Sequence, residues 1–237
     1  AMLRVQFSGV ARERLFEPLG LQRTAYNPSP ELFTNLAPTE IDPESQRPLR
    51  GIVHDENARA LGGVAPHAGL FSTAPDLAKF AQMMLWKGVY DHHRIVSRAA
   101  VEAFTRRHAF PGGESRALGW DTWSEEGSSA GVLFSPGSFG HTGFTGTSIW
   151  IDPARDLFVV LLTNRVHPTR ENRQIGEARP TIHDAVVRAL AAAPPVVRVG
   201  LDRLADGEVA ALAAVAGKRL GLVSHGASVT RDGRNAI

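Results

Sequence analysis

The chain has 237 residues, 43% of them hydrophobic, which is long and apolar enough for one large domain or one and a half ordinary ones. Charged residues make up 21% and leave a formal net charge of only +2, a balance that argues against nucleic acid as a partner. Because there is no cysteine, disulfides, thiolate catalysis and cysteine-ligated metal sites are excluded.

No membrane or targeting segment is visible in the chain. No stretch reaches the roughly 18 apolar residues that a membrane span needs. The amino terminus also lacks the charged-then-apolar layout of a secretory signal. Residues 1–16 begin inside an amphipathic helical pattern, so we expect the true start of the protein to lie upstream. Nothing in the sequence specifies an oligomeric state.

The amino-terminal half reads as helices separated by a long loop. Residues 1–16 predict a helix that a proline and a glycine end. The stretch over 17–75 carries most of the prolines and little periodicity, which predicts an ordered loop of the kind that covers a site. A helix is predicted over 73–88, and a cap at Ser97 predicts a short helix through Phe104.

From residue 118 onward the pattern changes to strands. We predict strands over 119–123, within 134–146, over 147–151 and over 157–162. The last two are joined by a short Asp/Pro turn, which indicates an antiparallel hairpin, and the unbroken apolar run LFVVLL favours a central strand covered on both faces. A closing helix over 181–193, with one apolar stripe, would cover the sheet. The predicted fold class is α/β (α+β), an antiparallel sheet flanked by helices.

The most informative string is SFGHTGFTGTSIWIDPARDLFVVLLTN, residues 138–164. It places His141, Thr142 and Gly143 at the end of a segment that enters the hairpin. Side chains there can face a cleft, and glycine allows a substrate to approach the backbone closely.

This string resembles the third motif of the penicillin-binding-protein and β-lactamase serine hydrolases, usually Lys-Thr-Gly, with His141 in place of the lysine. Two upstream blocks are similar to the class-C-like branch of that family. They read FEPLGL, residues 16–21, and GGVAPHAGLFSTAPDLAKFAQMML, residues 62–85. The ordered series of blocks makes the resemblance specific, and it implies an incomplete β-lactamase/transpeptidase-like fold.

The resemblance also implies roles for the motif residues. His141 would hold the substrate's carboxylate or polar leaving side by hydrogen bonding, Thr142 would add a hydroxyl contact, and Gly143 would keep the strand open. The backbone N–H of Phe144 would be one of two oxyanion donors. A periplasmic or extracellular location is expected from the family, and acyl-enzyme chemistry of this kind needs no cofactor.

The nucleophile of that family is missing from the chain. A Ser-x-x-Lys pair supplies the attacking hydroxyl, and a Tyr or Ser motif supplies the general base. None of the three lysines has a serine three residues before it, and neither tyrosine has an asparagine two positions on. In the family both motifs precede the helix with which this chain opens. We therefore expect that this polypeptide alone does not turn over substrate through a serine.

A cluster of His54, Asp55 and Glu56, followed by His67, could be imagined as a metal site because histidine and carboxylates suit zinc. Consecutive residues rarely bind one ion together, and no His-x-x-x-His occurs, so no metal is expected. The resemblance implies instead that His54, Asp55 and His67 brace a loop or line the cleft.

The tail has a different character. A linker over 194–199, which opens with two prolines, separates residues 1–193 from residues 200–237. The strings GLDRL, residues 200–204, and GKRLGLVSHGASVTRDGRNAI, residues 217–237, resemble the opening of the exo-β-N-acetylmuramidase family, which removes N-acetylmuramic acid from cell-wall fragments. The alternative is that the tail is the start of an unrelated α/β domain. So short a tail cannot bury a core of its own.

The sequence thus favours a fused cell-wall-processing protein that hydrolyses an amide or ester in peptidoglycan-derived material, such as a muropeptide or a small molecule. A general esterase is the rival within the same class. A non-catalytic module that binds a muropeptide or partner is the rival from another class. The upstream sequence discriminates them, because Ser-x-x-Lys there means an enzyme. With half a domain absent, we expect an exposed apolar face and poor solubility of the chain by itself.

Overall fold

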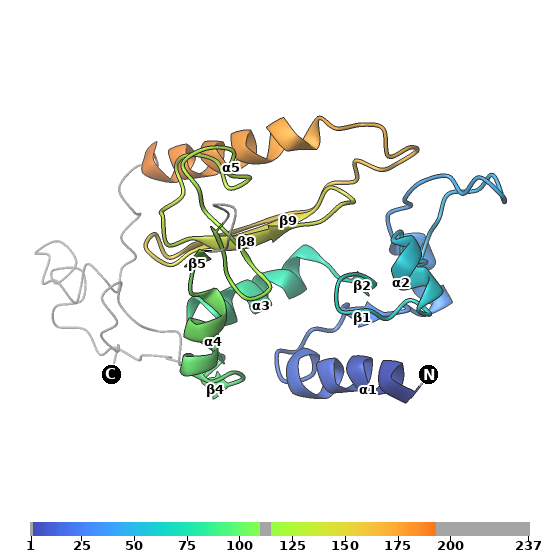
Figure 1. The fold of residues 1–237 in the computed structure, drawn as a ribbon. Coiled ribbons are helices and arrows are strands. Elements are labelled where there is room, and N and C mark those ends of the chain that lie inside the picture. The colour runs from blue at the N-terminus through green and yellow to red at the C-terminus, as the bar shows by residue number, and fades with distance from the viewer. Residues whose placement is uncertain (1, 110–114, 193–237) are drawn as a thin grey trace, which may run out of the picture. The chain divides into compact units, whose positions relative to one another are not determined.

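The computed structural model describes residues 2–109 and 115–192, and its first compact unit ends at Arg188. An antiparallel sheet of six strands lies at the centre of this unit (Figure 1), and each strand pairs with its neighbour in sequence. The strands are β5 (His108–Ala109), β6 (Ser115–Arg116), β7 (Asp121–Thr122), β8 (Phe139–Thr142), β9 (Ser148–Asp152) and β10 (Leu157–Leu161). The predicted antiparallel sheet with flanking helices is confirmed.

The β9–β10 hairpin matches its prediction in both strands and in the turn. The two strands pair from Asp152 opposite Leu157 to Ser148 opposite Leu161. Asp152 is fully buried, and its carboxylate accepts a hydrogen bond from the backbone N–H of Ala154 at 3.1 Å. This contact is the kind of local side-chain turn that favours an Asp/Pro sequence between strands.

The prediction that the last strand is central is wrong for the part of the chain that the structure describes. There β10 pairs only with β9 and forms one edge of the sheet. All five of its residues are half-buried, and helix α3 (Ala74–Leu85) packs against the strand. The apolar run therefore combines packing against a helix with an unpaired backbone edge.

Residues of β9 alternate between two cores because successive side chains of a strand point to opposite faces. Ile151 is fully buried in a cluster that includes Met83 of α3. Trp150, equally buried, packs in a second cluster with Val187 of helix α5 (Ile175–Ala192). Figure 1 shows the sheet lying between these two helices. Strand β8 is thereby held in the middle of a three-layer arrangement.

The remaining elements are short. They are α1 (Met2–Ala11), a π-helical turn η1 (Arg12–Phe16), a 3-10 helix η2 (Pro30–Asn35), α2 (Glu56–Ala60), α4 (Arg98–Thr105), and the strand pairs β1 (Ala25–Tyr26) with β2 (Leu70–Phe71) and β3 (Val89–Tyr90) with β4 (His93–Arg94). The predicted cap at Ser97 is confirmed, since its hydroxyl accepts from the Ala100 N–H at 3.1 Å. The long irregular stretch before α3 is confirmed as mostly loop.

Helix α5 begins at Ile175, six residues earlier than the pattern predicted. Pro180 lies inside the helix. As the sixth residue of the helix it lies beyond the first four N–H groups, so it removes the one helical hydrogen bond that residue 180 would otherwise donate to the Gly176 carbonyl. No helix within residues 2–109 and 115–192 is long and apolar enough to cross a membrane. The muramidase-like strings of residues 200–204 and 217–237 lie outside the described residues.

Candidate active site

The β8–β9 hairpin closes in a tight turn over residues 143–147. The Gly143 N–H donates to the Thr147 carbonyl at 2.7 Å, and the Gly146 N–H donates to the Gly143 carbonyl at 3.1 Å. A Cβ at residue 143 would collide with the Thr147 hydroxyl, and Gly146 has a φ of 114°, where other residues are strained. The glycines that stood out in the sequence are therefore required by the turn.

His141 lies on β8 with an exposed side chain. Its Nε2 is 3.3 Å from a terminal nitrogen of Arg116 on β6, and its Nδ1 is 2.8 Å from the Thr142 carbonyl. Because an arginine can only donate, Nε2 accepts and Nδ1 carries the proton. Both ring nitrogens are thus engaged. To hydrogen-bond a substrate through Nε2, His141 must therefore break its exposed hydrogen bond with Arg116.

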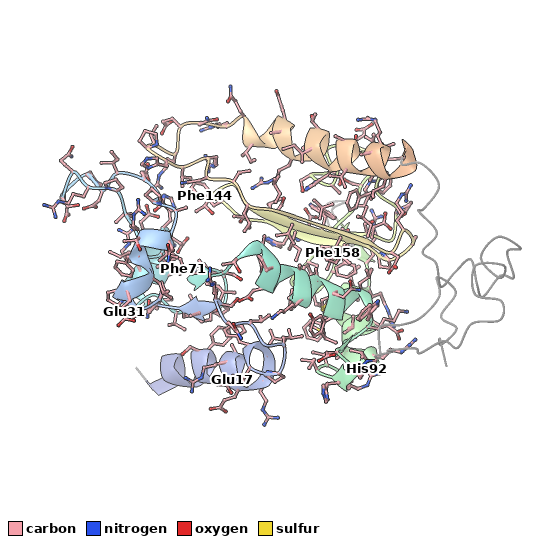
Figure 2. All side chains as sticks on the ribbon, turned by 180° about the vertical axis from the view of Figure 1, so that it is seen from behind. Glu17, Glu31, Phe71, His92, Phe144 and Phe158 are labelled. Carbon is pink, nitrogen blue, oxygen red and sulfur yellow. The ribbon has the colours of Figure 1, made fainter. Side chains whose placement is uncertain are left out.

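Phe144, labelled in Figure 2, follows the His-Thr-Gly sequence. Its side chain is 59% exposed. Its ring nevertheless has partners on two sides. The guanidinium of Arg165 lies 4.1 Å from the ring centroid and that of Arg170 lies 5.9 Å from it. The ring of His54 stacks on it at 5.7 Å and 21°. Each cation–π contact at an exposed site contributes about 0.5–1 kcal/mol, so the ring anchors the turn.

Arg179 of α5 holds the base of this turn. One terminal nitrogen donates to the Gly143 carbonyl at 2.6 Å and to the Thr147 carbonyl at 2.9 Å. The residue is only 9% exposed, and its buried Nε has no hydrogen-bond partner in the described part of the chain. Burial, followed by the charge of nearby Arg165, lowers the pKa of the Arg179 guanidinium.

The rest of the turn is held in the same way, through its carbonyl groups. Arg165 donates from Nε to the Phe144 carbonyl at 2.7 Å and from its backbone N–H to the Thr145 carbonyl at 2.9 Å. The Thr163 hydroxyl donates to the Gly146 carbonyl at 2.6 Å. The backbone N–H of Phe144, in contrast, donates to no acceptor among residues 2–109 and 115–192. It is a hydrogen-bond donor held in place without a partner.

A pocket of about 460 Å³ opens beside the turn. Its lining combines the turn with the segment that leads into α5, and consists of Thr142, Gly143, Phe144, Arg165, Arg170, Glu171, Arg173, Ile175, Gly176 and Arg179. Four arginines against one glutamate give the wall a positive charge. The start of α5 adds to it, because the unbonded N–H groups of a helix N-terminus carry partial positive charge.

A charge network reaches the Phe144 ring through Arg170 and His54. Arg170 contacts the Glu40 carboxylate from Nε at 2.7 Å and the Glu56 carboxylate from a terminal nitrogen at 2.5 Å. His54, which is buried, places its Nε2 3.1 Å from Glu40. The hydrogen bond from Arg170 lowers the pKa of Glu40 to about 2, and hydrogen bonds to Glu40 and then Glu56 raise the pKa of Arg170.

The loop that carries His54 and His67 contacts the turn through one of these residues. His54 stacks on Phe144, whereas Asp55 and His67 pair with each other at 3.1 Å. The Asp55 carboxylate also caps α2 by accepting from the Ala58 N–H at 2.7 Å, which is why an aspartate precedes this helix. No group of three or more metal-ligating side chains is positioned for an ion within the described ranges. Bracing by Asp55 and His67 stays a prediction.

Sequence reasoning missed the arginines of the site. Arg165, Arg170, Arg173 and Arg179 all lie between β10 and the second turn of α5, a segment that shows no helical or strand period. The density of arginine directly after a hairpin strand was the available signal. It could not show which side chains turn toward the carbonyls and which toward carboxylates.

A family model described as Beta-lactamase matches residues 5–197 of the chain. A Salmonella typhi protein named "Putative D-alanyl-D-alanine carboxypeptidase" is 37% identical over 177 residues, which is 68% of this chain and 40% of that protein. A Salmonella gallinarum protein of the same name matches equally well. The chain therefore spans about two fifths of the length of these curated relatives.

Solved structures share the fold. A β-lactamase from Mycobacterium bovis superposes with a TM-score of 0.50 at 24% identity, covering 77% of this chain and 56% of that one. A family VIII carboxylesterase gives a TM-score of 0.54 at 18% identity, covering 75% and 51%. At such identities these likenesses establish the fold alone, and they again align this chain with about half of each structure.

Proposed function

Because this chain belongs to the β-lactamase family of serine hydrolases, we propose that it supplies the substrate-binding strand and one oxyanion donor of an acyl-transfer site. The substrate would be an amide or ester in peptidoglycan-derived material. The serine nucleophile, its lysine and the general base would come from a segment upstream of residue 1. Supporting this, the chain aligns with only 40% of a curated relative, and its own lysines lack the family spacing.

The proposal rests above all on the Phe144 N–H. The carbonyls of residues 143–147 are all occupied, yet this N–H has no acceptor among residues 2–109 and 115–192. A donor aimed in advance at a developing negative charge stabilises a tetrahedral intermediate without reorganisation. When the serine oxygen adds to the substrate carbonyl carbon, the carbonyl oxygen becomes an oxyanion that can accept from Phe144. Collapse then breaks the bond to the leaving amine or alcohol, and water hydrolyses the acyl-enzyme.

The arginine-lined pocket supports a substrate with a carboxylate near the scissile bond. A chain that ends in D-alanine, as in the name of the Salmonella relatives, presents such a group. Thr142 and Gly143 line the pocket together with Arg165 and Arg179, so a carboxylate there would lie next to the turn. Guanidinium groups suit carboxylates because their donors match two oxygens at once. His141 would hold the same end of the substrate.

The wider assignment follows from the family and the tail. We propose that residues 1–193 are the carboxy-terminal part of the hydrolase domain, and residues 200–237 the first elements of a muramidase-like domain after the linker over 194–199. Fusion of two cell-wall activities would fit a periplasmic or extracellular location. This part of the proposal rests on the sequence resemblance alone.

The test is acylation of the full-length protein by a fluorescent penicillin or fluorophosphonate, beside the 237-residue chain and a His141→Ala variant of the full-length protein. We expect the long form to label through a serine upstream of residue 1 and the short chain to remain unlabelled. Labelling of the short chain would show that its nucleophile is not missing.

Two further outcomes separate the rivals. If the long form does not label but binds a muropeptide in calorimetry, the chain belongs to a binding module. If it labels and cleaves a neutral ester much faster than a peptide ending in D-Ala-D-Ala, it is a general esterase. Preferential cleavage of the peptide, lost in His141→Ala, would support the carboxypeptidase-like activity.

A further inference from the structure

Arg179 contacts the peptide unit that carries the Phe144 N–H. The Gly143 carbonyl and the Phe144 N–H are the two ends of one peptide unit, which is planar and almost always trans. Whatever fixes the direction of the carbonyl therefore fixes the opposite direction of the N–H. Arg179 donates to this carbonyl at 2.6 Å and to the Thr147 carbonyl at 2.9 Å.

We infer that Arg179 is a positioning residue for the oxyanion donor, because it orients and polarises the peptide unit that carries the Phe144 N–H. This inference rests on the proposed function. A charged donor on an amide oxygen draws electron density from the amide nitrogen, so the N–H at the other end becomes a stronger donor. Arg179 thus sets both the direction and the donor strength of the Phe144 N–H.

The surroundings of Arg179 support this role. Among the described residues it has no carboxylate partner, and both bonds of its terminal nitrogen go to carbonyls of the turn. Holding a 9%-exposed arginine whose Nε is unsatisfied is unfavourable for stability. A residue needed only for packing would be replaced by an apolar side chain without that penalty. The arrangement is explained if the guanidinium charge serves the turn.

Neighbouring contacts leave the peptide unit little freedom. Arg165 holds the next carbonyl, that of Phe144, at 2.7 Å and lies 4.1 Å from the Phe144 ring centroid. Within the described chain, the Gly143 carbonyl accepts one other hydrogen bond, from the Gly146 N–H at 3.1 Å. Arg179 thus provides the shorter of its two bonds and the charged one.

The kinetic test uses the full-length protein and a small neutral nitrophenyl ester, which has no carboxylate for the pocket to attract. We expect Arg179→Met to lower kcat about 10- to 100-fold, part of the loss caused by removing an oxyanion donor, with KM nearly unchanged. Arg179→Lys keeps the charge and should lose less, about 3- to 10-fold. Arg188→Met is the matched control, because Arg188 lies on the same helix with an exposed side chain that pairs with Asp184 at 3.7 Å and makes no hydrogen bond to the turn in the described part of the chain.

A spectroscopic test follows the peptide unit itself. Gly143–Phe144 is the single Gly-Phe step in this chain, so ¹³C′-glycine with ¹⁵N-phenylalanine labelling selects its correlation signal. The signal should move in Arg179→Met and Arg179→Lys but not in Arg188→Met. An unmoved signal, or a kcat in Arg179→Met equal to that of Arg188→Met, overturns the inference. A wild-type protein that neither labels nor hydrolyses overturns the proposed function instead, and the labelled signal still decides whether Arg179 orients the peptide.

Discussion

The arginines around Phe144 differ in what their side chains contact. Arg170 contacts two carboxylates, those of Glu40 and Glu56. Arg165 and Arg179 donate only to backbone carbonyls among the described residues. The paired arginine braces the loop that carries His54. The unpaired arginines hold the turn and leave their positive charge available to an anion, which is what a site for a carboxylate and an oxyanion needs.

The largest effect is expected at the backbone donor itself. In the full-length protein, Phe144→Pro removes the N–H, and we expect kcat to fall about 100- to 1,000-fold. Phe144→Leu keeps the N–H and loses only the ring contacts, so its loss should be far smaller. Ester hydrolysis by both variants, with a melting curve for each, separates the two. Equal losses in the two folded variants would mean that the ring, and not the N–H, matters.

For the carboxylate-paired Arg170 we expect an effect on stability that depends on pH. Glu40→Gln should lower the free energy of unfolding at pH 7 by about 1–2 kcal/mol, because Arg170 and His54 lose a charged acceptor. The folded-state pKa of Glu40 is lowered to about 2 from 4.5, so its stabilisation is present above pH 4.5 and lost as the pH falls toward 2.

Urea unfolding at pH 7, 4.5 and 3 checks this behaviour. The difference between wild type and Glu40→Gln should shrink as the pH falls. Glu171→Gln is the control, since Glu171 lines the pocket and its carboxylate forms no hydrogen bond or ion pair within residues 2–109 and 115–192. A difference that stays constant down to pH 3 would show that Glu40 is not held as a charged partner of Arg170.

A smaller effect on stability is expected at a buried histidine. His183 of α5 is fully buried, with Nδ1 2.8 Å from the Ser129 carbonyl and Nε2 3.4 Å from the Ser148 hydroxyl. Burial lowers its pKa below 6.5, so the unfolded chain binds a proton there first. Stability should therefore fall as the pH drops below about 6.5, by at most about 1.4 kcal/mol per pH unit.

Asparagine at this position keeps a donor near the Ser129 carbonyl and does not titrate. His183→Asn should consequently show a flatter stability profile between pH 6.5 and 5 than wild type does. Denaturant midpoints measured across this range, with His92→Asn as an exposed control, test the expectation. Parallel profiles for wild type and His183→Asn would contradict it.

The smallest effect is expected at the exposed His67–Asp55 pair. Surface ion pairs contribute about 0–1 kcal/mol, so His67→Ala should change stability by less than about 0.5 kcal/mol and leave ester hydrolysis unchanged. His54→Ala should change both, because His54 is buried against Glu40 and stacks on Phe144. A tenfold loss of activity in His67→Ala would place that residue in the cleft after all.

The sequence predicted the features of the fold that depend on local pattern. The β9–β10 hairpin, the cap at Ser97 and the glycine-rich turn after His141 all follow from turn chemistry and periodicity. The strand β10 was misplaced in the sheet because an apolar run reports burial and not which neighbours pair with it. The start of α5 was predicted six residues too late because the apolar stripe that marks the helix begins only at Ile182.

The sequence predicted only those residues of the candidate site that are adjacent to one another in the chain. His141 to Phe144 could be named because they form one motif. The arginines that hold them lie 21 or more positions away from Phe144 in the sequence, and their roles depend on whether carbonyls or carboxylates are within reach. Such choices are made by tertiary packing, which a single sequence does not specify.

The most direct measurement follows the Gly143–Phe144 correlation signal of the full-length protein while a phosphonate forms a stoichiometric covalent adduct with its serine. The phosphonyl oxygen stands in for the oxyanion of the tetrahedral intermediate. We predict that the Phe144 amide proton moves downfield as the adduct forms, because the N–H gains an acceptor, and that the shift is reduced in Arg179→Met. A Phe144 signal that stays in place during complete phosphonylation would contradict the account.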